Sequence, residues 1–360
     1  MSVPISSGCG TICGMAHCPI HCILPPYLLE RLARADDARV RALAIDALAR
    51  AAEFRATRHV YAALPGLGAM PSPTGRRYRL VYDARHGGYD ALPGTLVRKE
   101  GGRRSQDTAV NEAYTHSGHT YDFYKRTFGR NSLDDRGMAL VSSVHVGRRF
   151  NNAFWNGQQM AYGDGDGRLF TRFTRSLDVV GHELSHGVIT HTSNLEYRGE
   201  SGALNEHFAD VMGVLVRQWR KKQEAKEADW TVGADIMGHE TTARSLRTFT
   251  AEPAFENDPW LGTDPQPKHL RDKYRGSEDY GGVHINSGIP NHAFYLVATA
   301  LAGRAWERAG LIWYKTLLAL TSTSRFASMV AMTDQVAAAE FGYGSLEHKA
   351  VQNAWKRTGF

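Results

Sequence analysis

Two histidines and a glutamate near the middle of the chain have the residue types and the spacing of a metal-binding helix. The stretch at 181–187 reads GHELSHG. Because residues four apart share one face of a helix, His182 and His186 can direct their imidazoles at one ion. Glu183 projects beside the ion, where its carboxylate can hold a water molecule and take its proton. This pattern indicates a zinc hydrolase site, although H-E-x-x-H alone also occurs by chance on solvated helices.

A second acidic stretch offers the third ligand that catalytic zinc usually has. Apolar residues recur at helical spacing over 203–211, which places Glu206 and Asp210 one turn apart on the same face. We expect Glu206 to bind the ion and Asp210 to accept the other N–H of a ligand histidine, fixing its tautomer. Either acid alone would be interpreted as a surface charge. The pair, on an otherwise apolar helix, favours a functional role.

Several further stretches, in a fixed order, resemble one protein family. They are NAFW at 152–155, YGDGDG at 162–167, the region 197–210 and DYGGVHINSG at 279–288. Together with the H-E-x-x-H helix they are similar to the thermolysin-like zinc metallopeptidases (M4-type gluzincins), and most to their short-propeptide, protealysin-like branch. The resemblance runs from about residue 80 to the C-terminus. It implies a neutral endopeptidase with one catalytic zinc ion and with peptide or protein substrates.

The resemblance also implies roles for residues that spacing alone does not single out. The family's transition-state tyrosine and histidine correspond to Tyr197 and His284, which would hold the developing oxyanion. Asp279 would orient His284 through its imidazole N–H. The glycine-rich stretch 281–284 has a strand-like pattern, and its small residues would let a ligand approach His284.

Substrate contacts are likewise implied by the resemblance. Arg247 matches the family's arginine for a substrate carbonyl, and Asn152 with the Ala153 backbone would hold the substrate as an added edge strand. The positions of the family's S1′ pocket, which receives the residue after the scissile bond, are all apolar here. They predict cleavage on the amino side of bulky hydrophobic residues, with Phe173 making the pocket shallower, although the same side chains could simply be core. These positions are Phe170, Phe173, Val179, Val232, Ile236 and Leu246.

Calcium binding is the point at which this chain departs from the family's pattern. The family's double-calcium site needs several carboxylates, because calcium takes about six to eight oxygen ligands. Asp178 and Asp229 stand at matching positions, but Arg217, Thr231 and Ala234 replace three other oxygen-rich residues. A guanidinium cannot coordinate calcium, yet it can neutralise a carboxylate through a bidentate pair. Our hypothesis is that Arg217 replaces this double site, although calcium stays a candidate cofactor.

The N-terminus is rich in cysteine. The chain's four cysteines all lie in its first 22 residues, with histidines between them: Cys9, Cys13, His17, Cys18, His21 and Cys22. Their spacing matches no zinc module. Three interpretations stay open: a reduced flexible tail, an accessory metal or redox site, and a thiolate, Cys22 above all, that blocks the open position on the catalytic zinc.

The segment after the cysteines has the pattern of a small helical unit. Pro25 and Pro26 introduce residues 29–55, in which leucine and alanine recur at helical spacing. Pro-Pro-Tyr followed by a helix is similar to the propeptide of the protealysin-like branch, so residues 1–57 are expected to form an inhibitory, removable pro-segment. Glycine, proline and serine cluster in 58–78, which marks an exposed linker and the expected processing zone.

The rest of the chain divides into two lobes, which predicts an α+β fold. Residues 79–200 contain strand-like and helical stretches and include the H-E-x-x-H helix, whereas residues 201–360 are mainly helical. The resemblance implies the two-lobe thermolysin-like fold, with the zinc helix at the floor of the cleft between the lobes.

Composition and charge disfavour other classes of protein. Of the 360 residues 42% are hydrophobic, and the net charge is +6. The basic residues are scattered, which favours a solvated basic surface over a nucleic-acid partner. No apolar run reaches the roughly 18 residues of a membrane span, and the sequence shows no Sec signal peptide. We expect a monomer that is cytoplasmic as made. Secretion by a non-Sec route and a proteinaceous inhibitor as a partner stay open.

Three rival functions compete with a zinc endopeptidase made as a self-processing zymogen. A catalytically dead binding protein is disfavoured because Glu183, Tyr197 and His284 are all present. A latent enzyme whose pro-segment never leaves would keep its N-terminus after purification. A zinc aminopeptidase would need a site for the free substrate amine, and no such site is evident in the sequence.

Overall fold

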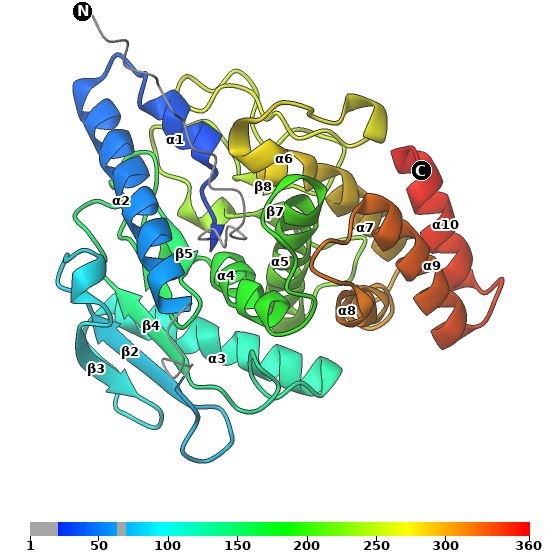
Figure 1. Ribbon diagram of the computed structural model, residues 1–360, viewed down its shortest axis with the longest axis horizontal. Helices are drawn as coiled ribbons and strands as arrows, with labels where there is room; N and C mark the ends of the chain where they lie inside the picture. The colour runs from blue at the N-terminus through cyan, green and yellow to red at the C-terminus, as the bar shows by residue number, and fades with distance from the viewer. Residues whose placement is uncertain (1–20, 63–69) are drawn as a thin grey trace, which may run out of the picture.

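The computed structural model describes residues 21–62 and 70–360. A mixed sheet lies on one side together with the long helices Ala38–Ala62 and Thr108–Phe128, two helices cross the centre, and a group of helices forms the other side (Figure 1). The predicted two-lobe α+β fold is confirmed. Cys9, Cys13 and Cys18, and residues 63–69 of the predicted linker, lie outside the described residues.

The N-terminal lobe is built on a mixed sheet. Its strands are β1 (His21–Cys22), β2 (Arg79–Asp83), β3 (Thr95–Lys99), β4 (Leu140–Val144), β5 (Ala153–Trp155) and β6 (Met160–Tyr162). The spatial order is β1-β5-β6-β4-β2-β3, in which β2, β4 and β6 run parallel and the other pairs antiparallel. The residues of β4, β5 and β6 are all buried, the two serines of β4 included, as expected for strands covered on both faces.

Helix α3 (Thr108–Phe128) packs against β2. It starts where the Asp107 carboxylate accepts the N–H groups of Ala109 and Val110, and it ends at Gly129 in the left-handed conformation. Both ends therefore follow ordinary capping chemistry.

Two buried helices carry the central motifs. Helix α4 (Leu177–Thr190) holds the H-E-x-x-H sequence, and α5 (Gly199–Lys221) holds the acidic stretch. They approach closely because glycines face each other: a Cβ on Gly213 would lie 2.5 Å from the carbonyl oxygen of Asp178, and one on Gly181 would lie 3.1 Å from the Cα of Gly213. Backbone contact at this point brings the two sets of functional side chains together.

The C-terminal lobe is mainly helical, as predicted. It contains α6 (Glu278–Asn286), α7 (Gly288–Leu301), α8 (Ala309–Ala319), α9 (Phe326–Phe341), α10 (Leu346–Thr358) and the short hairpin of β7 (Thr231–Val232) and β8 (Arg247–Thr248). The strand-like interpretation of 281–284 is wrong. This stretch belongs to α6, whose residues 279–282 have positive φ angles. Two of these four are glycines, which adopt such angles without steric cost.

The N-terminal segment forms two helices beside the catalytic lobes. Helix α1 (Pro26–Leu32) begins with a proline at its first position, and α2 (Ala38–Ala62) continues beyond residue 57, where we expected the pro-segment to end. Leu28, Leu29 and Leu32 of α1 are buried. None of the helices in the described part of the chain combines the length and the apolar character that a membrane crossing demands.

Candidate active site

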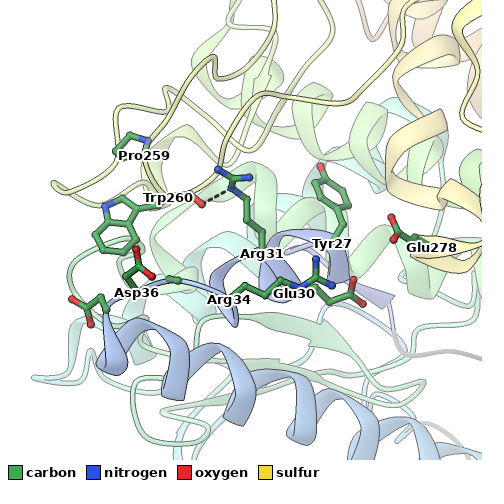
Figure 2. Close-up of a pocket in the computed structure, with 10 residues that line it drawn as sticks. Tyr27, Glu30, Arg31, Arg34, Asp36, Pro259, Trp260 and Glu278 are labelled. Carbon is green, nitrogen blue, oxygen red and sulfur yellow. Dashed lines mark hydrogen bonds between the residues drawn. The ribbon is translucent and has the colours of Figure 1, made fainter.

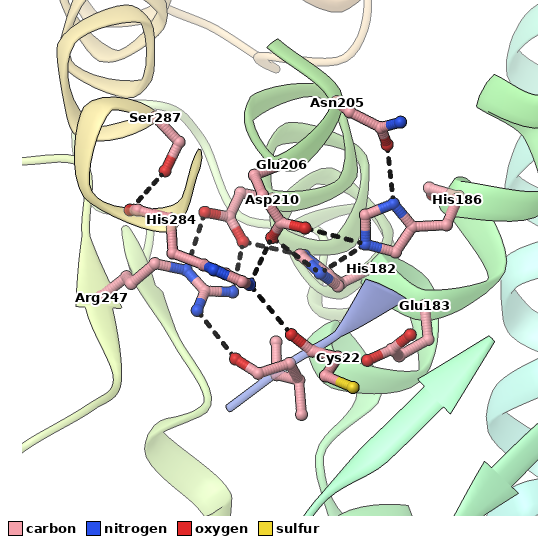
Figure 3. Close-up of polar contacts among 12 residues, drawn as sticks. Cys22, His182, Glu183, His186, Asn205, Glu206, Asp210, Arg247, His284 and Ser287 are labelled. Carbon is pink, nitrogen blue, oxygen red and sulfur yellow. Dashed lines mark hydrogen bonds and ion pairs between the residues drawn. The ribbon is translucent and has the colours of Figure 1, made fainter. Parts of the chain in front are cut away.

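The structure brings the predicted metal ligands together at the contact between α4 and α5. Among the described residues, His182, His186 and Glu206 form the group that could share one ion, with ligand atoms within 4.8 Å of one another. All three side chains are fully buried. The two histidine Nε2 atoms lie 3.0 Å apart, and each is 3.5 Å from a Glu206 oxygen. Figure 3 shows the two rings and the carboxylate directed at one point.

Hydrogen bonds behind the rings determine which nitrogen faces that point. His182 Nδ1 lies 2.8 Å from Asp210 Oδ1, so it must carry the proton that this carboxylate accepts. His186 Nδ1 lies 2.8 Å from Asn205 Oδ1, whose amide orientation is fixed because its Nδ2 donates to the Leu195 carbonyl. With Nδ1 turned to its acceptor in each ring, both Nε2 atoms face the same point, as the nitrogen ligands of one metal ion do.

The geometry fits a tetrahedral zinc ion. Ligands about 2.0–2.1 Å from zinc stand roughly 3.3 Å apart at tetrahedral angles, which matches the 3.0 Å and 3.5 Å separations seen here. In the described residues the buried Oε2 atom of Glu206 has no hydrogen-bond partner, and the same holds for Oε1 of Glu183. Two buried oxygens are thus left for a metal and for a water molecule.

Glu183 follows the first histidine in the sequence, but it is not one of the three residues grouped around the metal position. Its Oε2 accepts the Trp155 N–H at 3.0 Å, which ties the carboxylate to strand β5. Burial, and then the charge of Glu206, raise the pKa of Glu183 well above its usual value. Such a carboxylate can exchange a proton with a neighbouring water.

His284 is held as a donor that points into the site. Its Nδ1 lies 2.6 Å from Asp279 Oδ1, and its backbone N–H donates to Oδ2 of the same carboxylate. Its Nε2 lies 3.1 Å from the Tyr197 hydroxyl, which in turn donates to Glu206. Burial, the largest influence, lowers the pKa of His284, but the Glu206 and Asp279 carboxylates outweigh it and raise that pKa to about 9. The ring is therefore an imidazolium with two donors at neutral pH.

Asp210 joins the metal ligands to Arg247, the arginine predicted to bind a substrate carbonyl. It receives both Nε and Nη2 of Arg247, at 2.9 Å and 2.8 Å, in addition to His182. Asn291 Nδ2 also donates to it at 3.0 Å. Sequence reasoning missed Asn205 and Asn291. Asn205 offered a weak signal, because it is a polar residue on a helix whose neighbours are apolar.

The N-terminal segment occupies the cleft. Strand β1 pairs antiparallel with β5, and beyond it the Ile23 N–H donates to the Ala153 carbonyl at 3.3 Å. The Leu24 N–H donates to Asn152 Oδ1 at 3.1 Å. Arg247 Nη1 donates to the Ile23 carbonyl at 2.9 Å. Residues 22–24 thus contact the side chains that sequence analysis assigned to substrate binding.

Cys22 approaches the site differently from the thiolate hypothesis. Its carbonyl oxygen, rather than its sulfur, lies 3.1 Å from His284 Nε2 (Figure 3). In the described residues the group able to share a metal ion does not include the Cys22 thiol. Pairing with β5 turns the carbonyl of this residue towards the site, and the zinc-blocking thiolate stays a hypothesis.

The residues predicted to line the S1′ pocket are buried around the cleft. Their side chains are no more than 1% exposed and belong to one apolar cluster, which also contains Ile23: Phe170, Phe173, Val179, Val232, Ile236 and Leu246. The rings of Phe170 and Phe173 lie 6.2 Å apart. An apolar environment for the residue after Cys22 is therefore present.

Arg217 lies among the residues that replace the expected calcium ligands. Its Nη1 donates to Asp178 Oδ2 at 2.8 Å, and its Nη2 donates to the Thr231 carbonyl at 2.6 Å and lies 3.3 Å from Asp229 Oδ1. The side chains of Arg217 and Asp178 are almost fully buried. A fixed positive charge therefore occupies the middle of this acidic group.

A pocket lies at the seam between the N-terminal segment and the C-terminal lobe (Figure 2). It has a volume of about 560 Å³, and Tyr27, Arg31 and Arg34 line it from one side and Trp260 and Glu278 from the other. Arg31 Nε donates to the Trp260 carbonyl across it at 2.9 Å. The contact between the N-terminal segment and the C-terminal lobe thus leaves a space lined by polar side chains over part of its length.

Comparison of the sequence and the fold with known proteins identifies the family of this chain. Residues 72–190 match the thermolysin metallopeptidase catalytic domain, and residues 193–360 match the thermolysin metallopeptidase alpha-helical domain. The extracellular metalloprotease of Pectobacterium carotovorum is 41% identical over 95% of this chain and 96% of its own length. Protease PrtS of Photorhabdus is 48% identical over 78% of this chain and 76% of its own length. The precursor of protealysin, a metalloproteinase from Serratia proteamaculans, superposes with a TM-score of 0.84 at 43% identity, covering 94% of this chain and 99% of the other. The chain therefore belongs to the thermolysin family of metallopeptidases and is a thermolysin-like metalloendopeptidase.

Proposed function

We propose that this metalloendopeptidase is made as a latent precursor and cleaves peptide bonds on the amino side of bulky hydrophobic residues. One observation carries the proposal. Residues 22–24 pair with the edge strand β5 as a peptide substrate would, with carbonyl groups at His284 and Arg247. The buried residue that follows Cys22 in this strand is an isoleucine.

The catalytic roles follow from the positions of the side chains. Zinc, held by His182, His186 and Glu206, would supply a Lewis acid and lower the pKa of a bound water to about 7. Glu183 would take a proton from a water molecule and later deliver it to the leaving amine, because its Oε2 is anchored by the Trp155 N–H and its Oε1 has no hydrogen-bond partner among the described residues. His284 donates from its doubly protonated ring to the oxygen on which negative charge develops.

Tyr197 also stabilises the oxygen on which negative charge develops. Its hydroxyl lies within reach of both His284 and Glu206, so it can turn to the oxyanion when a peptide occupies the site. Arg247 holds the next carbonyl of the chain, and the bidentate pair with Asp210 fixes its direction. Asn152 brackets the backbone of the following residue. These contacts supply orientation, which is worth much of the barrier in such reactions.

Latency follows from the same contacts. While β1 lies on β5, no other peptide can pair with that edge, so the segment 21–62 must leave before the enzyme acts on a substrate. The seam is held by few polar contacts, among them Arg31 with Trp260 and Arg168 with Asp37 at 3.4 Å. Once the linker is cut, such contacts can be released. Secretion, suggested by the extracellular relative, is part of this proposal.

We also propose that Arg217 does the work of a calcium ion in this chain. Calcium would bring positive charge to Asp178 and Asp229, and the guanidinium already does so. The enzyme would then need zinc but no calcium at this place.

The test is hydrolysis of a blocked peptide with a central Gly-Leu bond after zinc loading. The wild type, freed of residues 1–57, should cleave it, lose this activity to a zinc chelator, and lose it in Glu183→Ala. Glu227→Ala, the same change at an exposed position, serves as the matched control and should stay active. If wild type and Glu183→Ala are both silent while each holds one zinc, the protein is a binding protein and the proposal is wrong.

A further inference from the structure

The bond between Cys22 and Ile23 lies where a substrate's scissile bond would lie. We propose that the enzyme cleaves its own chain at Cys22–Ile23, within the same molecule, and so sheds residues 1–22 in a step separate from removal of the rest of the pro-segment. The inference rests on the proposed function, because it uses the same catalytic groups. It goes further by naming a bond outside the predicted processing zone of residues 58–78.

The register of the strand is the first argument. The antiparallel pairing places Cys22 opposite Phe154, and the Ile23 N–H donates to the Ala153 carbonyl at 3.3 Å. The Leu24 N–H and carbonyl are both bonded by the Asn152 amide, at 3.1 Å and 3.5 Å. The backbone is therefore held on both sides of Ile23, in one register and one direction.

The two carbonyl groups give the second argument. The oxygen of Cys22 lies 3.1 Å from His284 Nε2, the donor assigned to the oxyanion. The oxygen of Ile23 lies 2.9 Å from Arg247 Nη1. The carbonyl carbon beside the oxyanion donor is the one that water attacks, and here it belongs to Cys22.

Space beside this carbonyl is the third argument. A cavity of about 300 Å³ adjoins the strand and is lined by Cys22 and Asn152 together with Tyr197, Tyr280 and His284. Cys22 lines this cavity although the residue is buried, and Leu24 lines it on the other side of the bond, so there is room for water beside the strand. A water molecule occupies about 30 Å³ in the liquid, so this cavity admits one easily.

The reaction balances with water alone. The water oxygen forms a bond to the Cys22 carbonyl carbon, and the bond from that carbon to the Ile23 nitrogen breaks. Glu183 accepts one proton from the water and passes it to the Ile23 nitrogen. The second proton of the water also passes to this nitrogen, so the products are a carboxylate at Cys22 and an ammonium group at Ile23, with no change of oxidation state.

The cut separates the cysteine-rich tail from the inhibitory helices. Residues 23–62 keep the contacts of Ile23 and Leu24 and the buried face of α1, so the cleft stays occupied after the cut. All four cysteines lie in residues 1–22 and leave with them. The shortened precursor is therefore free of thiols and still latent.

The experiment uses the full chain with zinc bound. Intact mass and N-terminal sequencing should show a new N-terminus at Ile23, formed at a rate that does not change over an about tenfold dilution. Thiol titration after desalting should fall from four per chain to none. Glu183→Gln should keep both Met1 and its thiols. Ile23→Leu should be cut like the wild type, whereas Ile23→Pro, which lacks the N–H, should be cut at least about a hundredfold more slowly.

A second readout does not depend on turnover. In Glu183→Gln, the amide hydrogens of Ile23 and Leu24 should exchange slowly, and Asn152→Ala should speed the exchange of Leu24 at least about tenfold. Rapid exchange of both amides in Glu183→Gln would overturn the register on which the inference rests.

The outcomes separate this inference from the proposed function. If enzyme freed of residues 1–57 cleaves the blocked peptide but the full chain keeps the Cys22–Ile23 bond, the inference is wrong and the function stands. If neither reaction occurs, both fail. A cut at this bond whose rate rises with protein concentration would overturn cleavage within one molecule.

Discussion

Replacing Arg217 with methionine should destabilise the protein strongly, and calcium should not stabilise the wild type. The guanidinium bonds Asp178 at 2.8 Å and the Thr231 carbonyl at 2.6 Å, and the Arg217 and Asp178 side chains are 1% and 0% exposed. The Gly233 N–H and the Ser176 hydroxyl also donate to Asp178, which keeps that carboxylate in place when the arginine is removed. The variant therefore leaves a buried negative charge without its counter-ion.

The magnitude follows from that geometry. Removing one partner of a buried ion pair costs about 3–5 kcal/mol. Unfolding entropy near Tm is about 2.1 cal/mol/K per residue, so a 360-residue chain has roughly 0.8 kcal/mol/K. The quotient predicts that Tm falls by about 4–7 °C.

The assay is thermal melting in zinc-buffered solution, with and without calcium. Arg217→Met should melt lower in both, and adding Asp178→Asn should recover most of the loss because no buried charge remains. Arg220→Met, on the exposed side of the same helix, is the matched control and should change Tm by less than about 1 °C. Arg217→Glu should gain stability from calcium. A wild-type Tm that rises by several degrees with calcium would refute the reasoning.

Three further predictions concern single side chains. The hydrogen bond to Asp164, aided by Asp107 and opposed by burial, raises the pKa of His145 to about 9. The stability that this ion pair contributes is thus fully present below about pH 6.5 and lost as pH rises through 9, so His145→Asn should lower Tm at pH 6 and hardly at pH 10. Asn205→Ala, which removes the acceptor of His186, should weaken zinc binding about 10–100-fold in competition with a chromogenic chelator, and unchanged affinity would contradict this. Phe173→Leu should raise kcat/KM for a Gly-Phe bond relative to Gly-Leu, and an unchanged ratio would show that Phe173 does not limit the pocket.

The two histidine ligands could be predicted from the sequence because helical spacing places them on one face, and Glu206 because it stands on an apolar helix soon after them. His182 and His186 share a face whatever surrounds the helix, and the apolar neighbours of Glu206 indicate a buried helix. The residues that hydrogen-bond to the metal ligands have weaker signals in the sequence. Asp210 stands one turn from Glu206, whereas Asn291 comes from α7 and reaches Asp210 only through the packing of α5 against α7. Tertiary contacts of that kind have no local signal.

The errors have physical causes too. The stretch 281–284 was interpreted as a strand because its glycines lack helix propensity, yet the same glycines permit the positive φ angles that turn His284 into the site. For Cys22 the sequence suggests a blocking thiolate as one of three open interpretations, because side-chain chemistry is visible in a sequence. The contact that forms uses its backbone carbonyl, which every residue has. The sequence signal for this contact is the position of Cys22, which begins an apolar Cys-Ile-Leu run just before two prolines.

Arg217 and the strand at Cys22 each stand where a partner from solution would otherwise bind. One supplies the positive charge that an ion would bring, and the other fills the edge that a substrate would pair with. An occupant that belongs to the chain pays no translational entropy on binding, which for a free partner costs at least about 4 kcal/mol. Its effective concentration does not fall on dilution. On the proposed latency, we therefore expect dilution and dialysis to leave the enzyme inactive, and cutting of the chain to end the block.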